Sequence, residues 1–502
     1  MDSEKRQLHL FFFPFLASGH LIPAIDMAKQ FALRGLKISI ITTPMNASLF
    51  SKTIEKSKTM GLDMNVLVIE FPCVEVGLPI GCESYQLATS LDLRTKFYQA
   101  TTMLEQPLEK LIQEYAPDCL VASTLFPWTT GVAKKFAIPR LILHSMSFFS
   151  TCTAECLRLY EPHKKVSSDT EPFIIPNFPD EIKMTRKQLP DYYTQNVQTY
   201  ATKMYEQALE AELTSFGAVF NSFYALEPAY ANFYKKVLGR KAWQIGPVSL
   251  CNQDAEDKAQ RGKEASIDFH ECFKWLNSKK PDSVVYVCFG SMANFNDSQL
   301  KEIAIGLEAS EQQFIWVVKK EKKDGGKEEW LPDGFEQRVK GKGLIIRGWA
   351  PQMMILDHEA VGGFVTHCGW NSTLEGVSAG LPMVTWPVSA EQFFNEKFVT
   401  QILRIGVAVG AQQWARFVGD SIKSEAIEKA VIRIMVGAEA EEIRSRAREL
   451  GKKAKKAVEE GGSSYSDLNS LIEELRSHGI AGTKGSFKQL QIYDSKARNM
   501  YT

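Results

Sequence analysis

Short apolar runs alternate with amphipathic stretches along the first half of the chain. A run without polar interruptions is typical of a parallel strand buried on both faces. Strands that alternate with helical periodicity build a parallel sheet covered by helices on both sides. The pattern therefore predicts an α/β fold whose first sheet contains the runs at residues 8–15, 36–43, 64–71, 119–124 and 140–146.

The same rhythm restarts in the second half at residues 283–291. Amphipathic stretches at 297–310 and 371–380 separate the apolar runs that follow, which predicts a second sheet of the same kind. Its further strands are expected at residues 313–318, 343–350, 362–368 and 381–388. Between the halves, residues 251–266 are polar and without periodicity. This segment predicts a linker or mobile loop and a domain boundary near residue 250.

The two ends of the chain need separate interpretations. At the start, a charged segment precedes the apolar stretch at 8–19, an order that secretory leaders also have. We interpret the stretch as a buried first strand, because residues 19–35 follow with helical periodicity and residues 36–44 form another apolar run. At the end, residues 440–478 predict two charged helices, and everything from residue 479 onward predicts a loose tail.

Composition narrows the possible partners. The 502 residues are enough for two hydrophobic cores, so two domains are expected. Lys plus Arg and Asp plus Glu both number 59, which leaves no net charge to attract nucleic acid or an anionic membrane. No apolar run reaches the ~18 residues that span a bilayer. We therefore expect a small-molecule partner and a monomeric protein.

The cysteines indicate a compartment. Nine of them occur without a CxxC pair. An odd number spread over so long a chain is typical of reduced thiols in a cytosolic protein, and it argues against zinc. The sequence thus predicts a cytoplasmic location.

The most distinctive polar segment is HCGWNSTLEG, residues 367–376, which directly follows an apolar run. In open parallel sheets, ligands bind beyond the carboxyl ends of strands, where the free N–H groups of a helix start favour anions. Gly369 allows a close backbone approach at this point. Side-chain donors are available from His367, Asn371 and Ser372. The combination predicts a cradle for a pyrophosphate.

Groups suited to the rest of a sugar nucleotide lie on both sides of this segment. Glu375, one helical turn after Asn371, can accept hydrogen bonds from both hydroxyls of a ribose. Trp349 offers a flat face to a base, and Glu391 and Gln392 suit sugar hydroxyls. Each residue alone has a simpler explanation as core or helix cap. Groups suited to a base, a ribose, a pyrophosphate and a hexose thus occur together in one domain, which favours a sugar-nucleotide site.

Residues 349–392 resemble the 44-residue signature of plant secondary-product UDP-glycosyltransferases. The resemblance extends to FPFLASGHLIPAIDMAKQFA at 13–32 and to VVYVCFGSM at 284–292, so it covers nearly the whole chain. ITTPMNASLFSK and GLPIGCE resemble the branch that glucosylates flavonoids, coumarins and triterpenoid saponins. The resemblance implies an inverting hexosyltransferase with UDP-glucose as co-substrate and no other cofactor.

The resemblance also implies a fold. Similar proteins have the GT-B fold, in which two Rossmann-like domains turn their parallel sheets toward a central cleft. By this likeness, residues 1–250 bind the acceptor and residues 251–463 bind the UDP-sugar. A final helix at about 464–478 packs back on the first domain, and residues 479–502 form the tail.

Matching positions imply the donor contacts. Trp349 is expected to stack on uracil, with the backbone of Ala350 and the side chain of Gln352 against the nucleoside. Glu375 is expected to hold the ribose. The phosphates are implied to contact Ser291, His367, Asn371 and Ser372, and the sugar to contact Trp370, Glu391 and Gln392. Gln392 implies glucose, because relatives that prefer galactose tend to carry His there.

The acceptor needs a base, and His20 is the candidate. It matches the catalytic His of the family, and it starts a helix whose dipole favours a neutral imidazole. The sequence departs from the family at the partner of this base, where relatives usually carry Asp and this chain has Ser123. Ser123 can hold a tautomer by hydrogen bonding, but it brings no charge to an imidazolium. Asp118 lies near the start of the same strand and cannot simply replace the missing acid.

Three explanations of this departure stay open. Water or another acid assists His20, the acceptor is acidic enough to need little help, or activity on ordinary alcohols is weak. Two other classes of protein also stay open, a sugar-nucleotide epimerase of the same fold and a catalytically weak UDP-sugar-binding protein. No DxD motif occurs, so no metal is expected at the diphosphate.

The acceptor pocket is only outlined by the sequence. Residues 77–88, 144–152 and 189–209 are rich in Phe, Met, Tyr and Leu, and they are candidates to line a broad apolar pocket. Such a pocket predicts a large lipophilic acceptor, either a triterpenoid or a phenolic.

Overall fold

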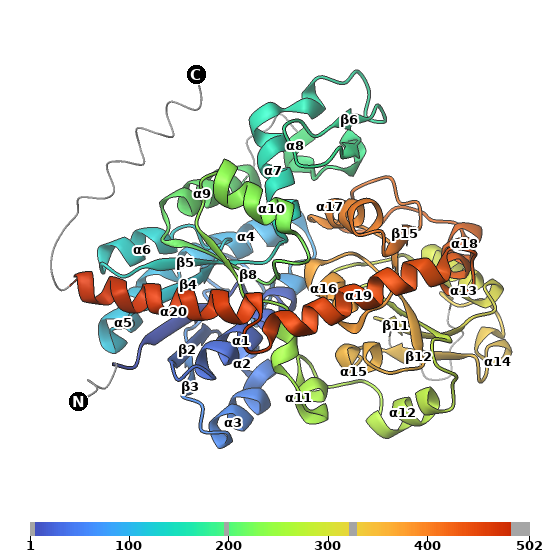
Figure 1. Cartoon of the computed structure of the whole chain (residues 1–502), viewed down its shortest axis with the longest axis horizontal. Coiled ribbons are helices and arrows are strands. Elements are labelled where there is room, and N and C mark those ends of the chain that lie inside the picture. Colours follow the sequence, from blue (N-terminus) through green and yellow to red (C-terminus); the bar gives the residue numbers. More distant parts are fainter. Residues whose placement is uncertain (1–5, 195–199, 321–328, 483–502) are drawn as a thin grey trace.

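Two parallel β-sheets, each covered by helices, form the body of the protein (Figure 1). The structure is a computed structural model that describes residues 6–194, 200–320 and 329–482. Among these residues, the first sheet has seven parallel strands in the order β3-β2-β1-β4-β5-β8-β9. They are β1 (His9–Phe13), β2 (Lys37–Thr42), β3 (Met64–Val68), β4 (Cys119–Ser123), β5 (Arg140–His144), β8 (Gly217–Phe220) and β9 (Ala242–Gln244).

The second sheet, counted over the same described ranges, has six parallel strands in the order β12-β11-β10-β13-β14-β15. They are β10 (Val284–Cys288), β11 (Gln313–Val318), β12 (Gly343–Arg347), β13 (Val361–Thr366), β14 (Met383–Thr385) and β15 (Gly406–Ala408). A separate antiparallel pair consists of β6 (Phe173–Ile174) and β7 (Lys183–Met184).

The ten apolar runs predicted as strands form β1 to β5 and β10 to β14. Every residue of β1 is buried, as the centre of a sheet requires, which confirms the strand interpretation of the first apolar run. Strands β8, β9 and β15 lie outside the predicted runs. Three or four residues are too few to give a periodic signal, so sequence reasoning missed them.

Four helices begin a few residues after the carboxyl end of a strand. They are α1 (Ser18–Ala32) after β1, α15 (Gln352–Leu356) after β12, α16 (Trp370–Ala379) after β13 and α17 (Gln392–Lys397) after β14. Because the strands are parallel, these helix starts lie at the carboxyl edges of the two sheets. Further helices up to residue 232 are α2 (Pro44–Ala47), α3 (Ser51–Thr59), α4 (Leu91–Thr102), α5 (Glu105–Tyr115), α6 (Thr129–Lys135), α7 (Phe148–Tyr160), α8 (Asp191–Thr194), α9 (Tyr200–Thr214) and α10 (Pro228–Asn232). Those after it are α11 (Ala255–Gln260), α12 (Phe269–Asn277), α13 (Asp297–Ala309), α14 (Phe335–Arg338), α18 (Ser424–Met435), α19 (Ala440–Val458) and α20 (Ser463–Gly482).

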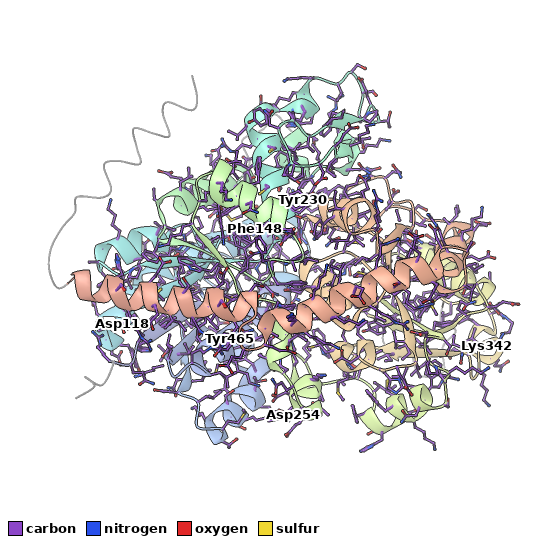
Figure 2. The ribbon with its side chains drawn as sticks, in the orientation of Figure 1. Asp118, Phe148, Tyr230, Asp254, Lys342 and Tyr465 are labelled. Carbon is purple, nitrogen blue, oxygen red and sulfur yellow. The ribbon has the colours of Figure 1, made fainter. Side chains whose placement is uncertain are left out.

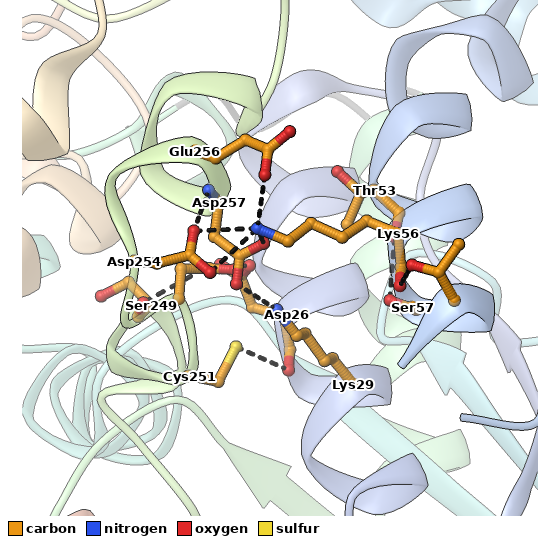
Figure 3. Close-up of polar contacts among 12 residues, drawn as sticks. Asp26, Lys29, Thr53, Lys56, Ser57, Ser249, Cys251, Asp254, Glu256 and Asp257 are labelled. Carbon is orange, nitrogen blue, oxygen red and sulfur yellow. Dashed lines mark hydrogen bonds and ion pairs between the residues drawn. The ribbon is translucent and has the colours of Figure 1, made fainter. Parts of the chain in front are cut away.

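The predicted loop at residues 251–266 contains helix α11. Asp254 caps this helix, since its carboxylate accepts a hydrogen bond from the backbone N–H of Asp257 at 2.7 Å. Lys56, which lies on α3, forms ion pairs with the start of the helix (Figure 3). A helix of 6 residues held by distant side chains has no hydrophobic periodicity, so the loop prediction was wrong for this part.

The two C-terminal helices run over different sheets (Figure 1). α19 packs on α16 of the second sheet, whereas Leu468, Leu471 and Ile472 of α20 belong to the core of the first. Tyr465 on α20 is labelled in Figure 2, and the guanidinium carbon of Arg34 lies over its ring, 4.3 Å from the centroid. Because α20 continues to Gly482, the prediction of a loose tail was wrong for 479–482; the rest of that tail lies outside the described residues.

Candidate active site

A cavity of about 1320 Å³ lies between the two sheets at their carboxyl edges. Residues from both halves of the chain line it. Twelve of the predicted site residues face this one cavity, namely His20, Ser291, Trp349, Ala350, Gln352, His367, Trp370, Asn371, Ser372, Glu375, Glu391 and Gln392. Of the predicted set, Ser123 alone is not among the lining residues that the structure describes.

His367 is held between two glycines. A Cβ atom on Gly290 or on Gly369 would lie 2.5 Å from its ring, and Gly290 also has a φ of +66° that disfavours other residues. The ring is 8% exposed, and burial, helped by the charge of Lys319, lowers the pKa of His367 to about 4. The imidazole is therefore neutral near pH 7, with one N–H to offer an anion in the cavity.

The first turn of α16 presents backbone N–H groups to the cavity, because no side chain caps it at Gly369. The side chain of Asn371 is already hydrogen-bonded to another residue, because its Nδ2 donates to the carbonyl oxygen of Gly19 at 2.6 Å. Ser372 Oγ accepts from Gln352 Nε2 at 3.3 Å and keeps its own proton for a ligand. The helix start is thus suited to a phosphate group, mainly through its backbone.

Glu375 lies one turn further along α16 and is 7% exposed. Its Oε2 accepts from Gln352 Nε2 at 2.7 Å, and its Oε1 accepts from Arg261 Nη1 at 2.5 Å. Gln352 in turn accepts from the hydroxyl of Tyr286 at 3.4 Å. Both carboxylate oxygens face defined donors, so the carboxylate is oriented before any ligand arrives.

Trp349 packs against the end of the linker between the sheets. Its backbone N–H donates to Ser266 Oγ at 2.8 Å, and its carbonyl oxygen accepts from the N–H of Ser266 at 2.8 Å. A Cβ atom on Gly262 would lie 2.5 Å from the indole ring, so only glycine fits there. Trp349 lines the cavity, and nothing in the sequence indicated Gly262 as its neighbour.

The residues expected to hold the sugar differ in what they can offer. The side chain of Trp370 is 2% exposed, and its indole N–H donates to the carbonyl oxygen of Asn221 at 2.7 Å, so only its backbone is left for a sugar. Gln392 Oε1 accepts from the N–H groups of Val388 and Ser389 at 2.8 and 2.9 Å. Its NH₂ group stays available. Burial raises the pKa of Glu391.

His20 is the third residue of α1, and its ring packs edge-on against Phe15 at 5.3 Å between centroids. Burial lowers the pKa of His20 to about 4, so the imidazole is neutral at physiological pH. Desolvation by burial acts in the same direction as the helix dipole that the sequence analysis invoked. Within the part of the chain that the structure describes, no protein group is hydrogen-bonded to this ring.

Ser123, whose role the sequence leaves open, forms no hydrogen bond to His20 among the residues that the structure describes. It is 2% exposed at the end of β4, and its Oγ accepts from the backbone N–H of Leu125 at 3.2 Å. Its carbonyl oxygen accepts from Arg140 Nη2 at 2.9 Å, and burial lowers the pKa of Arg140 to about 9. The hydroxyl thus stabilises the turn after the strand, and the position next to it already holds a buried cation.

The part of the cavity lined by the first sheet's half of the chain is aromatic, with a buried charged cluster. All three segments predicted to line it contribute, with Tyr85 from the first, Met146 from the second and Tyr205 from the third. Glu212 lies 3.5 Å from His144 Nε2 and 2.9 Å from Arg240 Nη1. Although burial acts to raise it, these partners lower the pKa of Glu212 to about 2.

Several residues of the site carry no sequence signal. Gln86 bridges the halves, because its Nε2 donates to Ser291 Oγ at 2.7 Å while its Oε1 accepts from Ser18 Oγ at 3.2 Å. Arg261 lies in the polar linker, where nothing in the local pattern distinguishes it. Burial lowers the pKa of Lys319 to about 8 at the edge of the same cavity.

Metal-binding clusters and membrane-spanning helices are both absent from the described residues. No group of three or more His, Cys, Asp or Glu side chains lies where it could hold a metal ion. No helix of the described chain has both the length and the apolar character needed to cross a membrane.

The chain matches a family model described as "UDP-glucoronosyl and UDP-glucosyl transferase" over residues 85–431. It is 55% identical over 476 residues to the scopoletin glucosyltransferase of Nicotiana tabacum, covering 95% of this chain and 99% of that protein. It is 56% identical over 486 residues to UDP-glucose flavonoid 3-O-glucosyltransferase 7 of Fragaria ananassa, covering 95% and 98%. The crystal structure of Glycyrrhiza uralensis UGT73P12 complexed with glycyrrhetinic acid 3-O-monoglucuronide matches with a TM-score of 0.89 and 41% identity, over 99% of this chain and 100% of that one.

Proposed function

Because the chain belongs to the UDP-glucoronosyl and UDP-glucosyl transferase family and is a UDP-glycosyltransferase of GT-B fold, we propose that it transfers glucose from UDP-glucose to an oxygen of a lipophilic acceptor. One observation carries the proposal. A neutral His20 from the first sheet faces the same cavity as the uncapped start of α16 and Glu375 from the second. The proposed base and the proposed nucleotide site therefore line the same cavity.

The proposed reaction inverts the anomeric carbon. His20 accepts the proton of the acceptor hydroxyl, whose oxygen forms a bond to the anomeric carbon while the bond from that carbon to the diphosphate oxygen breaks. The electron pair leaves with UDP. Backbone N–H groups of α16 and the neutral N–H of His367 stabilise the charge that develops there. An α-linked donor yields a β-glycoside.

We assign donor contacts by position. Trp349 stacks on the base, Gln352 and the backbone of Ala350 contact the nucleoside, and Glu375 accepts from the ribose. The diphosphate lies on the start of α16, near Ser291 and His367. Glu391 and the NH₂ group of Gln392 bind the hexose, and Gln392 is the reason to expect glucose. We also propose that residues 1–250 bind the acceptor and that residues 251–463 bind the donor. The final helix then packs back on the first domain.

The remaining expectations follow from the same assignment. The helix start and His367 take the part that a divalent ion plays at other diphosphate sites, so we expect turnover without a metal and without a further cofactor. We expect a monomer in the cytoplasm. These points are proposals that a chelator, a sizing column and fractionation would test.

The acceptor is proposed from the cavity and the relatives together. The aromatic side of a cavity of about 1320 Å³ suits a large flat or fused-ring molecule. The relatives carry names that refer to scopoletin and flavonoids, and the structural relative was crystallised with a triterpenoid glucuronide. We therefore propose phenolic and triterpenoid acceptors, linked through a hydroxyl or a carboxyl.

The test is turnover of UDP-glucose with scopoletin, a flavonol and a triterpenoid acid, in the presence of EDTA. Mass spectrometry should find a glycoside and an equal amount of UDP with at least one acceptor. Conversion of UDP-glucose to UDP-galactose without an acceptor would favour an epimerase, and tight UDP binding without either product would favour a binding protein. Neither alternative finds support in the relatives, which are named as glucosyltransferases.

A further inference from the structure

The linker helix α11 is fixed to the helices of the first sheet by ion pairs (Figure 3). Lys56 Nζ lies 2.9 Å from the carboxylate of Asp254, 3.1 Å from that of Glu256 and 2.9 Å from that of Asp257. Lys29 on α1 pairs with Asp257 at 2.7 Å, and both side chains are under a tenth exposed. The residues that follow α11 therefore enter the donor site from a fixed point.

Arg261, the first residue after α11, joins the two halves of the site. Its Nε donates to Asp26 Oδ2 at 2.7 Å, and its Nη1 donates to Glu375 Oε1 at 2.5 Å. The exposed fractions of the three side chains are 12% for Arg261, 4% for Asp26 and 7% for Glu375. Charge-assisted bonds shielded from water in this way are stronger than neutral ones and hold their geometry. Arg261 thus fixes the plane of the Glu375 carboxylate.

Glu375 keeps room for a ligand despite these contacts. An ionised carboxylate has about four acceptor sites, and Arg261 and Gln352 occupy one on each oxygen. One site on each oxygen is left, which is the arrangement that the two hydroxyls of a ribose need. Over the described ranges, Nη2 of Arg261 donates to no protein group, and the residue lines the cavity. The guanidinium therefore orients the carboxylate without saturating it.

We propose that Arg261 is a positioning residue for the donor, which holds Glu375 in the orientation that receives the ribose diol. The inference rests on the proposed function, because that function places the ribose at Glu375. Asp26 lies on α1, the helix that also carries His20, so the same guanidinium links the ribose site to the helix of the base. A polar linker without any motif thereby becomes part of the nucleotide site.

The experiment measures binding of UDP and of 2′-deoxy-UDP by calorimetry on the full chain. Arg261→Gln should weaken UDP binding about tenfold and bring the ratio of the two dissociation constants close to one, because the contact with the 2′-hydroxyl is lost. Arg261→Lys keeps the charge near Asp26 but loses the planar guanidinium, so the variant should fold normally. Its ratio of the two dissociation constants should still fall most of the way to one. With UDP-glucose as substrate, KM should change more than kcat.

Lys258→Gln is the matched control, because it removes another linker ion pair, the one with Asp357 at 2.6 Å, and leaves Arg261 in place. It should preserve both affinities. A second control, Glu375→Gln, separates this inference from the proposed function. If it leaves the ratio unchanged, the ribose does not lie at Glu375 and the proposed donor site fails.

If Glu375→Gln brings the ratio of the two dissociation constants to one while Arg261→Lys leaves it at the wild-type value, only the inference about Arg261 is overturned. Tighter UDP binding in either Arg261 variant would also overturn it, since the guanidinium would then compete with the ribose. Should Arg261→Gln fail to fold, the decision rests on the lysine variant. A folded lysine variant with a lowered ratio and an unaffected Lys258→Gln supports the proposal.

Discussion

Asn371 Nδ2 donates a hydrogen bond of 2.6 Å to the carbonyl oxygen of Gly19, the residue immediately before His20. Asn371 lies in the first turn of α16, so this bond ties the proposed phosphate site to the backbone of the proposed base. Asn221 Nδ2 donates to Asn371 Oδ1 at 3.1 Å and holds the amide from the other side. A contact between the helices of the two sheets thus fixes the distance between His20 and the start of α16, the proposed base and the proposed diphosphate site.

His20→Ala should remove transfer to alcohol acceptors and leave UDP affinity nearly unchanged. The proposed base is on the first sheet's helix α1, whereas most of the proposed nucleotide contacts are on or next to the second sheet's helices. Loss of a general base typically costs ~10²–10⁴-fold in rate. The measurements are kcat with a saturating alcohol acceptor and the dissociation constant of UDP by calorimetry. Full turnover in the variant would show that His20 only fills space beside Phe15.

Gly290→Ala should impair catalysis more than folding. Its Cβ would lie 2.5 Å from the ring of His367 and displace the proposed diphosphate donor, and its φ is +66°. Gly61→Ala is the matched control, because its φ of +79° gives comparable strain while no atom lies within 4 Å of the added Cβ. Both should lose about 1 kcal/mol of unfolding free energy from the positive φ, and Gly290→Ala should lose more because its Cβ also displaces the His367 ring. Only Gly290→Ala should also lower kcat/KM for UDP-glucose, and equal kinetics in the two variants would contradict the role of His367.

The two-sheet fold, and the residues through which the second sheet lines the cavity, could be predicted from sequence for a local reason. Buried strands give unbroken apolar runs, and the chain reverses into a helix at each carboxyl edge. Trp349 and His367 therefore line one cavity because each follows a strand of the second sheet, and Glu375 lies there because it is on the helix that begins just after His367. Their shared location follows from the parallel strand topology, so it can be predicted without knowing any side-chain contact.

The contacts that complete the site could not be predicted, because they join segments far apart in the chain. Arg261 reaches Asp26 and Glu375, and Gln86 reaches Ser291, without any periodicity that marks them. The same limit explains Ser123. Its position could be aligned with an expected acid, but the hydrogen bond that its Oγ accepts from the backbone N–H of Leu125 depends on the turn after β4.

Gln392→Glu should lower kcat/KM for UDP-glucose while the chain still folds. The substitution keeps an oxygen to accept from the N–H groups of Val388 and Ser389, so the turn is preserved. It replaces the available NH₂ donor by an acceptor and adds a charge near Glu391. A loss of about tenfold is expected for a hydrogen bond to a sugar hydroxyl. Wild type should prefer UDP-glucose over UDP-galactose; the reverse preference, or an unaffected variant, would remove Gln392 from the sugar site.

Ser123→Asp tests the missing acid through the pH dependence of the rate. His20 must be neutral to accept a proton, and burial lowers its pKa to about 4, so wild-type kcat/KM should fall only as the pH drops through about 4. A carboxylate beside the imidazole favours the charged form and raises its pKa. The acid limb of the variant should therefore move upward toward the ordinary value of 6.5, and the profile should be flat above it.

The variant should also distinguish acceptors by their acidity. An anion next to His20 stabilises the imidazolium that forms in the transition state, and this matters most when the acceptor holds its proton tightly. An alcohol such as a triterpenoid should thus gain more in kcat than scopoletin, whose phenol needs little help. Arg140 is the competitor for the new carboxylate, since it already donates to the carbonyl oxygen of Ser123 at 2.9 Å. If the carboxylate pairs with Arg140 instead, neither the acid limb nor the rate with the alcohol will move, and another group must supply the charge that His20 needs.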